Sequence, residues 1–335
     1  MKSYILHGKQ DLRLEERPVP DLLPHQVLIR VKRVGICGSD VHYFSHGSIG
    51  TFVPKRPFAL GHEFAGEVVE VGADVRHIQP GMAVAIDPSM PCGTCRLCRG
   101  GRYNLCENMK YLGSASCDPH LDGAFGEFVP MPAANCFPIP AGLSFAEAAM
   151  LEPLSVAMHA VLRSGTVAGR SVLITGGGTI GQLVLLVARA FGADRIAVSD
   201  IDEFPRQFAL RTGADAAFDP REPAVDEFDI VFEAAGVPAA LVAALRLARR
   251  GGTVVQIGSL PAEVPLPANL IMAKELTVAG SFRFAHVFPM ALNLAAAKRI
   301  DLRPLITATY PFAELPQAME RAVKKQNVIK VQVEL

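Results

Sequence analysis

An apolar, β-branched run leads straight into a glycine-rich turn in the segment Val172-Leu173-Ile174-Thr175-Gly176-Gly177-Gly178-Thr179-Ile180-Gly181. A helical pattern over 179–191 follows at once. Gly176, Gly178 and Gly181 fit the spacing G-x-G-x-x-G. The first glycine permits a tight turn, the second lets the backbone approach a phosphate, and the third lets helix and strand pack closely. The segment therefore predicts a strand, turn and helix that bind a dinucleotide, with Thr179 and Ile180 at the helix N-terminus.

A second strand ends at Asp200, about 20 residues beyond these glycines. A carboxylate at this position accepts hydrogen bonds from the adenosine ribose and repels a 2′-phosphate, so the sequence favours NAD over NADP. Arg206 is close in sequence and is available to a phosphate, which leaves NADP open. The alternative is a glycine-rich turn with a helix-capping aspartate. The order strand, glycines, helix, strand, acid argues against it.

Strand and helix patterns alternate outward from this turn, which predicts an α/β fold with a doubly wound parallel sheet. The expected strands are 171–175, 195–199, 229–233, 252–257 and 276–280, and the expected helices are 179–191, 202–212 and 238–250.

The first 140 residues have a different texture, with short β-branched runs separated by proline and glycine. Gln26–Val31 and Phe64–Val71 are the clearest strands, and the pattern predicts a small barrel-like domain. Near residue 144 the texture changes, and Ser144 with Glu147 forms a capping-box pattern that opens a helical stretch to about Leu162.

The last segment contains two expected helices and a closing strand, at Pro289–Lys298, Phe312–Lys324 and Val328–Val333. A terminal strand has to pair somewhere, and we expect it to fold back onto the first domain.

Bulk composition limits the partners of the chain. Lysine plus arginine and aspartate plus glutamate each total 33 of 335 residues, so no strong field attracts nucleic acid or an anionic membrane. The N-terminus lacks the pattern of a signal peptide, and no apolar run is long enough to span a bilayer. We therefore expect a cytoplasmic protein with a small-molecule substrate.

Four of the seven cysteines lie close together, as Cys92, Cys95, Cys98 and Cys106. The spacing C-x2-C-x2-C-x7-C supplies the four thiolates of a closed, structural zinc site. An iron–sulfur cluster is the main alternative, because similar spacings hold clusters. Cys117 and Cys136 are expected to be ordinary core thiols.

A second metal site is suggested by residues that bring different ligand atoms. Cys37 lies in Gly35-Ile36-Cys37-Gly38-Ser39-Asp40-Val41-His42-Tyr43, and His62 and Glu63 follow Gly61. Glu152 opens the later helical segment. Together they would make a mixed sulfur, nitrogen and oxygen site with a position left for water or substrate, which is typical of catalytic zinc. Spacing alone does not choose between Glu63 and Glu152, and each residue also has an ordinary structural reading.

These motifs, in this order, resemble the zinc-dependent medium-chain alcohol and polyol dehydrogenases over essentially the whole chain. Glu152-Pro153-Leu154 resembles the sorbitol-dehydrogenase-like branch, and segments such as Pro88–Gly93 and Gly280–Phe284 look most like the L-idonate 5-dehydrogenases. The resemblance implies a GroES-like catalytic domain, 1–143 with 285–335, and a Rossmann domain, 144–284.

The resemblance also implies one catalytic zinc at Cys37, His62 and Glu63, with Glu152 as a ligand or as the holder of the zinc water, and one structural zinc at the four-cysteine set. Ser39 would take the proton of a secondary alcohol and His42 would pass it to solvent. Tyr43, Phe125 and Arg283 are the candidates for the substrate pocket, and Arg283 could pair with a substrate carboxylate or instead form an ion pair at a domain interface. By analogy the protein would be a homo-oligomer, a dimer or tetramer. A non-enzymatic nucleotide-binding protein and a redox protein built on the cysteines remain as alternatives.

Overall fold

A computed structural model of the chain describes residues 1–222 and 227–335 and divides into two units. The first unit is Met1–Glu152 with Phe288–Leu335, and the second is Pro153–Val287. The expected boundary between 143 and 144 differs from this division. Helix α3 (Phe145–Ala149) packs on the strands of the first unit, so the first unit extends to Glu152.

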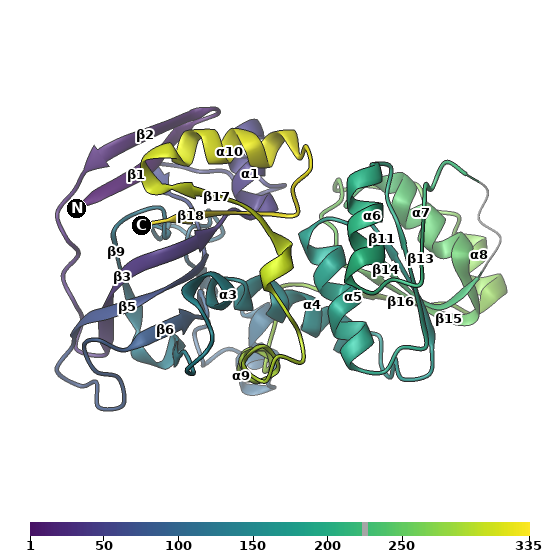
Figure 1. Cartoon of the computed structure of the whole chain (residues 1–335), viewed down its shortest axis with the longest axis horizontal. Coiled ribbons are helices and arrows are strands. Elements are labelled where there is room, and N and C mark those ends of the chain that lie inside the picture. The colour runs from purple at the N-terminus through teal and green to yellow at the C-terminus, as the bar shows by residue number, and fades with distance from the viewer. Residues whose placement is uncertain (223–226) are drawn as a thin grey trace. The chain divides into compact units, whose positions relative to one another are not determined.

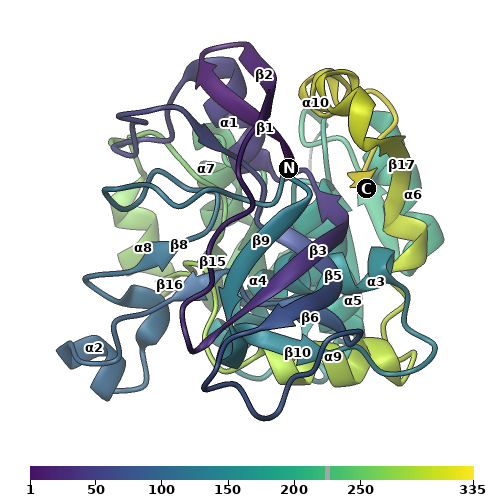
Figure 2. The same ribbon diagram turned by 90° about the vertical axis from the view of Figure 1, so that its left-hand side faces the viewer.

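The first unit is built mainly from short strands (Figure 2). Its strands are β1 (Lys2–Gly8), β2 (Asp11–Glu16), β3 (Gln26–Gly35), β4 (Phe58–Ala59), β5 (Glu63–Val71), β6 (Ala83–Ile86), β7 (Ser89–Met90), β8 (Lys110–Tyr111), β9 (Phe128–Pro132), β10 (Cys136–Pro138), β17 (Ile306–Pro311) and β18 (Lys330–Glu334). Its helices are α1 (Gly38–His46), α2 (Arg96–Arg99), α3, α9 (Phe288–Ala296) and α10 (Leu315–Lys324), with 3-10 turns η1 (Tyr103–Leu105), η2 (Ala133–Asn135), η3 (Arg303–Leu305) and η4 (Phe312–Glu314).

The main sheet of this unit has the strand order β10-β6-β5-β3-β18-β17, and β9 also pairs with β3. A second sheet has the order β2-β1-β4, and β7 pairs with β8. The closing strand β18 pairs antiparallel with β3, so the prediction that the C-terminal strand returns to the first domain is confirmed. The helix predicted at 312–324 is divided, because η4 precedes α10.

The second unit is a parallel sheet with the order β13-β12-β11-β14-β15-β16. Figure 1 shows α5, α6, α7 and α8 around these strands. The elements are α4 (Leu151–Arg163), which begins in the first unit, β11 (Ser171–Thr175), α5 (Thr179–Ala190), β12 (Arg195–Ser199), α6 (Glu203–Thr212), β13 (Ala216–Phe218), β14 (Phe228–Glu233), α7 (Pro238–Leu247), β15 (Ala248–Gln256), α8 (Ala268–Lys274) and β16 (Thr277–Gly280). The predicted doubly wound sheet is confirmed.

One predicted boundary in this unit is wrong. The helix expected over 238–250 ends at Leu247, and the next strand begins at Ala248 rather than at 252. Gly251 has φ +71°, and a Cβ on Gly252 would lie 2.8 Å from the Arg249 carbonyl oxygen. The backbone of this strand therefore bends at two glycines, and it begins before them instead of after them. None of the helices among the described residues is both long and apolar enough to cross a membrane.

Candidate functional site

Cys37 is the N-cap residue of α1 and lies two positions after the end of β3. Its N–H donates to Asp40 Oδ2 at 2.9 Å, and the N–H of Gly61 donates to Asp40 Oδ1 at 3.2 Å. Asp40 is fully buried. One carboxylate therefore fixes the segment that carries Cys37 to the turn that carries His62.

His62 and Glu63 lie where β5 begins, and Glu63 is the β-sheet partner of Gly35. One possible ligand atom from each of Cys37, His62 and Glu63 lies within 4.8 Å of the others. The structure therefore brings three of the four predicted catalytic-site ligands together. Glu152 is outside this three-residue group but is buried in the first turn of α4, close enough for His62 and Glu63 to influence its pKa.

The electrostatics of this group suit a cation. Burial alone would lower the pKa of His62, but Asp40 and Cys37 raise it well above the ordinary value. Buried His62 Nδ1 also has no hydrogen-bond partner among the described residues. Burial raises the pKa of Glu152 to about 7. A soft thiol, an imidazole and carboxylates are a donor set that zinc accepts, so these residues fit the metal.

Glu63 is engaged by a buried ammonium from the other end of the chain. Lys330 Nζ, on β18, donates to Glu63 Oε2 at 2.6 Å, to Oε1 at 2.9 Å and to the Ile36 carbonyl oxygen at 3.1 Å. A Cβ on Gly35 would lie 2.2 Å from Glu63 Oε2, so the glycine leaves the space in which that carboxylate sits. Glu63 is thus held in one orientation beside Cys37.

Ser39 and His42 are three residues apart on α1, so they lie on the same side of the helix. Partial burial of the ring, together with nearby His46 and Lys325, lowers the pKa of His42. The lowered pKa favours the neutral imidazole, which can accept a proton. His42 is also exposed, as a residue that delivers protons to solvent should be.

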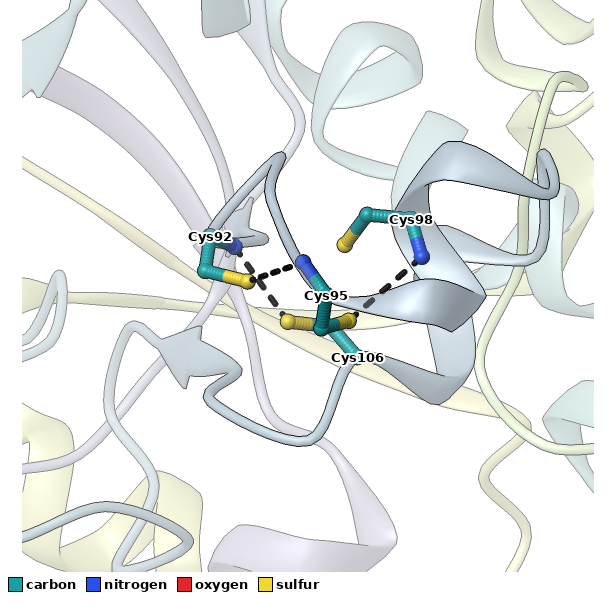
Figure 3. A group of neighbouring side chains, drawn as sticks. All are labelled: Cys92, Cys95, Cys98 and Cys106. Atoms are coloured by element: carbon teal, nitrogen blue, oxygen red, sulfur yellow. Dashed lines mark hydrogen bonds between the residues drawn. The ribbon is translucent and has the colours of Figure 1, made fainter.

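The four predicted cysteine ligands converge at a second place in the first unit (Figure 3). Their ligand atoms lie within 4.8 Å of one another. Backbone N–H groups point at the sulfurs, from Cys92 to Cys106 Sγ at 3.2 Å, from Cys95 to Cys92 Sγ at 3.4 Å and from Cys98 to Cys95 Sγ at 3.5 Å. Hydrogen bonds from the backbone lower the pKa of Cys92 to about 5, which favours the thiolate, whereas burial raises the pKa of Cys98 to about 12. This donor set also fits zinc.

In the second unit the glycine-rich turn joins β11 to α5 as predicted. Gly176 has φ +93°, and a Cβ there would lie 2.7 Å from Ala235. A Cβ on Gly181 would lie 1.9 Å from the Gly176 carbonyl oxygen, so this helix packs against the turn only with glycine present. A Cβ on Gly178, the N-cap residue of α5, would have no neighbouring atom within 4 Å, so this side of the turn is open. Phosphates can approach the helix N-terminus on that side, so the residues fit a dinucleotide.

Asp200 lies directly after β12 and belongs to the same turn. Its Oδ2 accepts from the N–H of Gly177 at 2.7 Å. The Arg206 guanidinium donates to the Asp200 carbonyl oxygen at 2.7 Å and lies 3.5 Å from Asp219 Oδ2. Arg206 is therefore already engaged by an acid and a carbonyl.

The three predicted substrate residues have separate surroundings. Tyr43 and Phe125 are fully buried in the core of the first unit. The Tyr43 hydroxyl accepts from the N–H of Ala115 at 3.0 Å, and the Phe125 ring fills the space beside Gly61. These are the contacts of core residues, and the substrate role of Tyr43 and Phe125 stays a prediction. Arg283 lies in the second unit, with its guanidinium 4.9 Å from the centre of the Phe282 ring.

Comparison with known proteins identifies the family. The model for the alcohol dehydrogenase GroES-like domain matches residues 23–141, and that for zinc-binding dehydrogenases matches residues 179–297. Sorbitol dehydrogenase of Bacillus subtilis (strain 168) is 39% identical over 346 residues, covering 99% of this chain and 97% of that protein. The chain belongs to the zinc-dependent medium-chain dehydrogenases.

Solved structures agree with this dehydrogenase family and confirm the predicted fold class, a GroES-like domain with a Rossmann domain. L-idonate 5-dehydrogenase from Escherichia coli K-12 MG1655 is 34% identical, covers 100% of this chain and 98% of its own, and gives a TM-score of 0.95. A zinc-binding dehydrogenase from Sinorhizobium meliloti 1021 bound to NADP is also 34% identical, with coverage of 100% and 99% and a TM-score of 0.92.

Sequence reasoning missed three residues that touch the predicted catalytic-site residues of this dehydrogenase: Asp40, Lys330 and Tyr111. Tyr111 donates from its hydroxyl to Glu152 Oε1 at 2.6 Å. Asp40 could have been suspected, because an acid three residues after an N-cap position often bonds back to it. Lys330 and Tyr111 carry no local signal, since each reaches its partner across the fold.

Proposed function

We propose that this dehydrogenase oxidises a secondary alcohol of a polyol or sugar acid and transfers the hydride to NAD, with NADP as the poorer acceptor. L-idonate, giving 5-keto-D-gluconate, is the first candidate substrate. Sorbitol, xylitol, threonine and a butanediol are the alternatives. The grouping of Cys37, His62 and Glu63 within 4.8 Å, beside buried Glu152, is the observation that carries the proposal.

We propose two zinc ions per chain, one held by Cys37, His62 and Glu63 or Glu152, and one held by the four cysteines. When bound, the first supplies a Lewis acid for the alcohol oxygen, and the dinucleotide at the glycine turn supplies the hydride acceptor. Ser39 takes the proton of the alcohol, and exposed His42 passes it to solvent. Asp40 and Lys330 hold the ligand residues in place and prevent their reorientation during the reaction.

Nucleotide preference is supported by the surroundings of Asp200. Its carboxylate accepts from the N–H of Gly177 at Oδ2 and from the N–H of Asp202 at Oδ1, and each oxygen keeps a lone pair for a ribose hydroxyl. Arg206 lies 3.5 Å from Asp219. A cytoplasmic location also remains part of the proposal, supported by seven cysteines that form no disulfide in the described structure.

A homo-oligomer completes the proposal. Strand β16 is the last in its sheet and, among the described residues, pairs with β15 alone. Val278 on that strand is exposed, as are the nearby chain positions Met272 and Phe282. An open edge with apolar neighbours favours pairing with a second copy.

The first prediction is tested by steady-state kinetics. The zinc-loaded protein should oxidise L-idonate with a higher kcat/KM than sorbitol, xylitol, threonine or 2,3-butanediol, and with NAD rather than NADP.

Cys37→Ser should abolish turnover while the four-cysteine metal stays bound. Arg283→Gln should reduce kcat/KM for L-idonate, which has a carboxylate, much more than for neutral sorbitol.

The kinetic and metal-binding results distinguish the sugar-acid, polyol and non-enzymatic alternatives. Preference for a neutral polyol, with equal effects of Arg283→Gln on both substrates, would reject the sugar-acid proposal but keep the polyol class. No turnover of any alcohol by protein with two equivalents of zinc would reject the enzymatic proposal. A visible absorption band with bound iron would replace the structural zinc by an iron–sulfur cluster.

A further inference from the structure

Tyr111 stands between the two groups of metal-ligating residues in the first unit. It is the second residue of β8 and lies five positions after Cys106, the last cysteine of the segment 92–106 that carries the four cysteines and is called the lobe below. It is buried, as is Glu152, the acid that accepts from its hydroxyl. A residue placed in this way can carry the state of one group to the other.

On the lobe side, Tyr111 is part of a small apolar cluster. Cys106, Met109 and Tyr111 form its buried members, and Cys92, Cys95 and Cys98 pack against them. Tyr111 therefore shares one apolar cluster with the side chains that would hold the structural metal. If those cysteines spread apart, the packing of this cluster changes.

The backbone of Tyr111 is fixed as well. Tyr111 pairs with Ser89 in the two-residue ladder of β7 and β8, and the next N–H, of Leu112, donates to the Pro88 carbonyl oxygen at 3.2 Å. Because the backbone cannot follow a movement of the lobe freely, the orientation of the side chain depends on the packing around its ring.

On the catalytic side, Tyr111 contacts two residues of the predicted zinc site. Its hydroxyl donates to Glu152 Oε1 at 2.6 Å, a short bond of the kind made to charged acceptors. Its ring lies edge-to-face against the His62 ring, with centroids 5.7 Å apart. A buried carboxylate without a donor is unfavourable, so loss of the hydroxyl leaves Glu152 free to turn toward another partner.

We propose that Tyr111 is a positioning residue that couples the two metal centres: the four-cysteine lobe orients the Tyr111 ring, and the Tyr111 hydroxyl orients Glu152 at the catalytic metal. The proposal rests on the proposed function, in which Glu152 binds that metal or holds its water. It gives the structural metal a role in the reaction beyond the stability of its own loop.

Removal of partners that orient metal ligands usually costs about 10- to 100-fold in metal affinity or activity. Tyr111→Phe removes one oxygen and keeps the ring on the lobe. We therefore expect chelator-promoted zinc release from the catalytic centre to become about 10-fold faster or more, while release from the lobe is unchanged. At saturating zinc, kcat should fall by a similar factor with a smaller change in KM, because Glu152 is misplaced at the reacting oxygen.

The experiment follows zinc release from the full-length holoenzyme to a chromogenic chelator. Cys37→Ser and Cys95→Ser assign the two kinetic phases, since each removes a ligand from one centre. Tyr4→Phe is the matched control, because Tyr4 is a buried tyrosine of the same unit whose hydroxyl donates to the Ala313 carbonyl oxygen at 2.9 Å and not to a predicted metal ligand. The control should leave both phases unchanged.

The Cys95→Ser variant tests whether a change in the lobe reaches the catalytic centre. Cys95→Ser should accelerate zinc release from the catalytic centre, and adding Tyr111→Phe to it should give little further effect, because both changes interrupt one connection. Unchanged catalytic-phase release in Tyr111→Phe would overturn the proposal. So would equal acceleration of both phases in Tyr111→Phe and Tyr4→Phe, since that is general loosening. Zinc release needs no turnover, so an inactive wild-type protein would reject the proposed function without deciding this inference.

Discussion

At the scale of single residues, the ion pair between Lys330 and Glu63 gives a clear prediction. Both side chains are buried, and the Lys330 ammonium bonds both oxygens of Glu63. Burial alone would lower the pKa of Lys330, but Glu63 and Cys37 raise it, so the residue is charged. Removing one member of a buried pair costs about 3–5 kcal/mol, because the other charge remains in the interior. Lys330→Met should lower the free energy of unfolding by that amount in urea titrations of the zinc-free protein.

A second variant separates the lost pair from lost packing. Replacing both members of a buried pair by apolar residues is often nearly neutral. Lys330→Met with Glu63→Met should therefore be more stable than Lys330→Met alone. A free energy of unfolding for Lys330→Met alone that lies within about 1 kcal/mol of the wild-type value would contradict this explanation.

The residues that could be predicted from the sequence are those whose chemistry shows in a short window. Cys37 and His62 stand out because their side chains are metal ligands beside glycines, and the four cysteines stand out by spacing. Lys330 meets Glu63 across 267 positions of the chain, and Tyr111 meets Glu152 across 41. No local pattern contains such a pair, since the fold alone brings its members together.

At the scale of elements, the start of α3 shows how a predicted local motif is joined to a distant helix. The N–H of Glu147 donates to Ser144 Oγ at 3.2 Å, and the N–H of Ser144 donates to Glu147 Oε2 at 3.0 Å, as the capping-box pattern predicts. Lys298, just beyond α9, donates to Glu147 Oε1 at 2.8 Å. Glu147→Gln should destabilise the protein by about 1–2 kcal/mol at pH 7, by loss of the charge-assisted bonds.

The pH dependence of that effect has a definite sign. Burial raises the pKa of Glu147, but Lys298 and Ser144 outweigh it and lower the pKa below the ordinary value of 4.5. A carboxyl group whose pKa is lower in the folded than in the unfolded state stabilises the fold at pH values above its unfolded-state pKa. This stabilisation is lost as the pH falls through its folded-state pKa. The stability difference between wild type and Glu147→Gln should be constant above pH 4.5 and shrink below it. A difference that grows on acidification would reject the assignment. Ser144→Ala serves as the control that removes the cap but keeps the charge.

Element boundaries were less predictable than element types. The helical stretch expected from Ser144 to about Leu162 is two helices, α3 and α4, with Met150 between them. Pro153 lies in the first turn of α4 and has no N–H to donate to the Ala149 carbonyl, so it interrupts one long helix and is tolerated at the start of the second. The strand β17 was missed because its sequence, Ile306–Pro311, lies in a proline-rich stretch without clear alternation.

At the scale of the whole molecule, the returning C-terminal strand follows from a simple requirement. A strand needs a hydrogen-bonding partner, and β18 finds it in β3, with Val333 opposite Val34. The sequence could predict this return but not its register. In the observed register the Lys330 side chain reaches Glu63, a contact that no local pattern predicts.

The same requirement applies to the edge of the second unit and gives the last prediction. Val278 is 43% exposed on β16, the end strand of the parallel sheet. If two copies pair through this edge, light scattering at micromolar concentration should report a multiple of the 35.9 kDa chain. Val278→Lys should shift the mass toward smaller species and leave zinc content unchanged, because a charge on an edge strand opposes pairing. Leu14→Lys is the matched control, since Leu14 is 48% exposed on β2, the end strand of another sheet. A wild-type monomer, or equal effects of both lysines, would reject β16 as the interface.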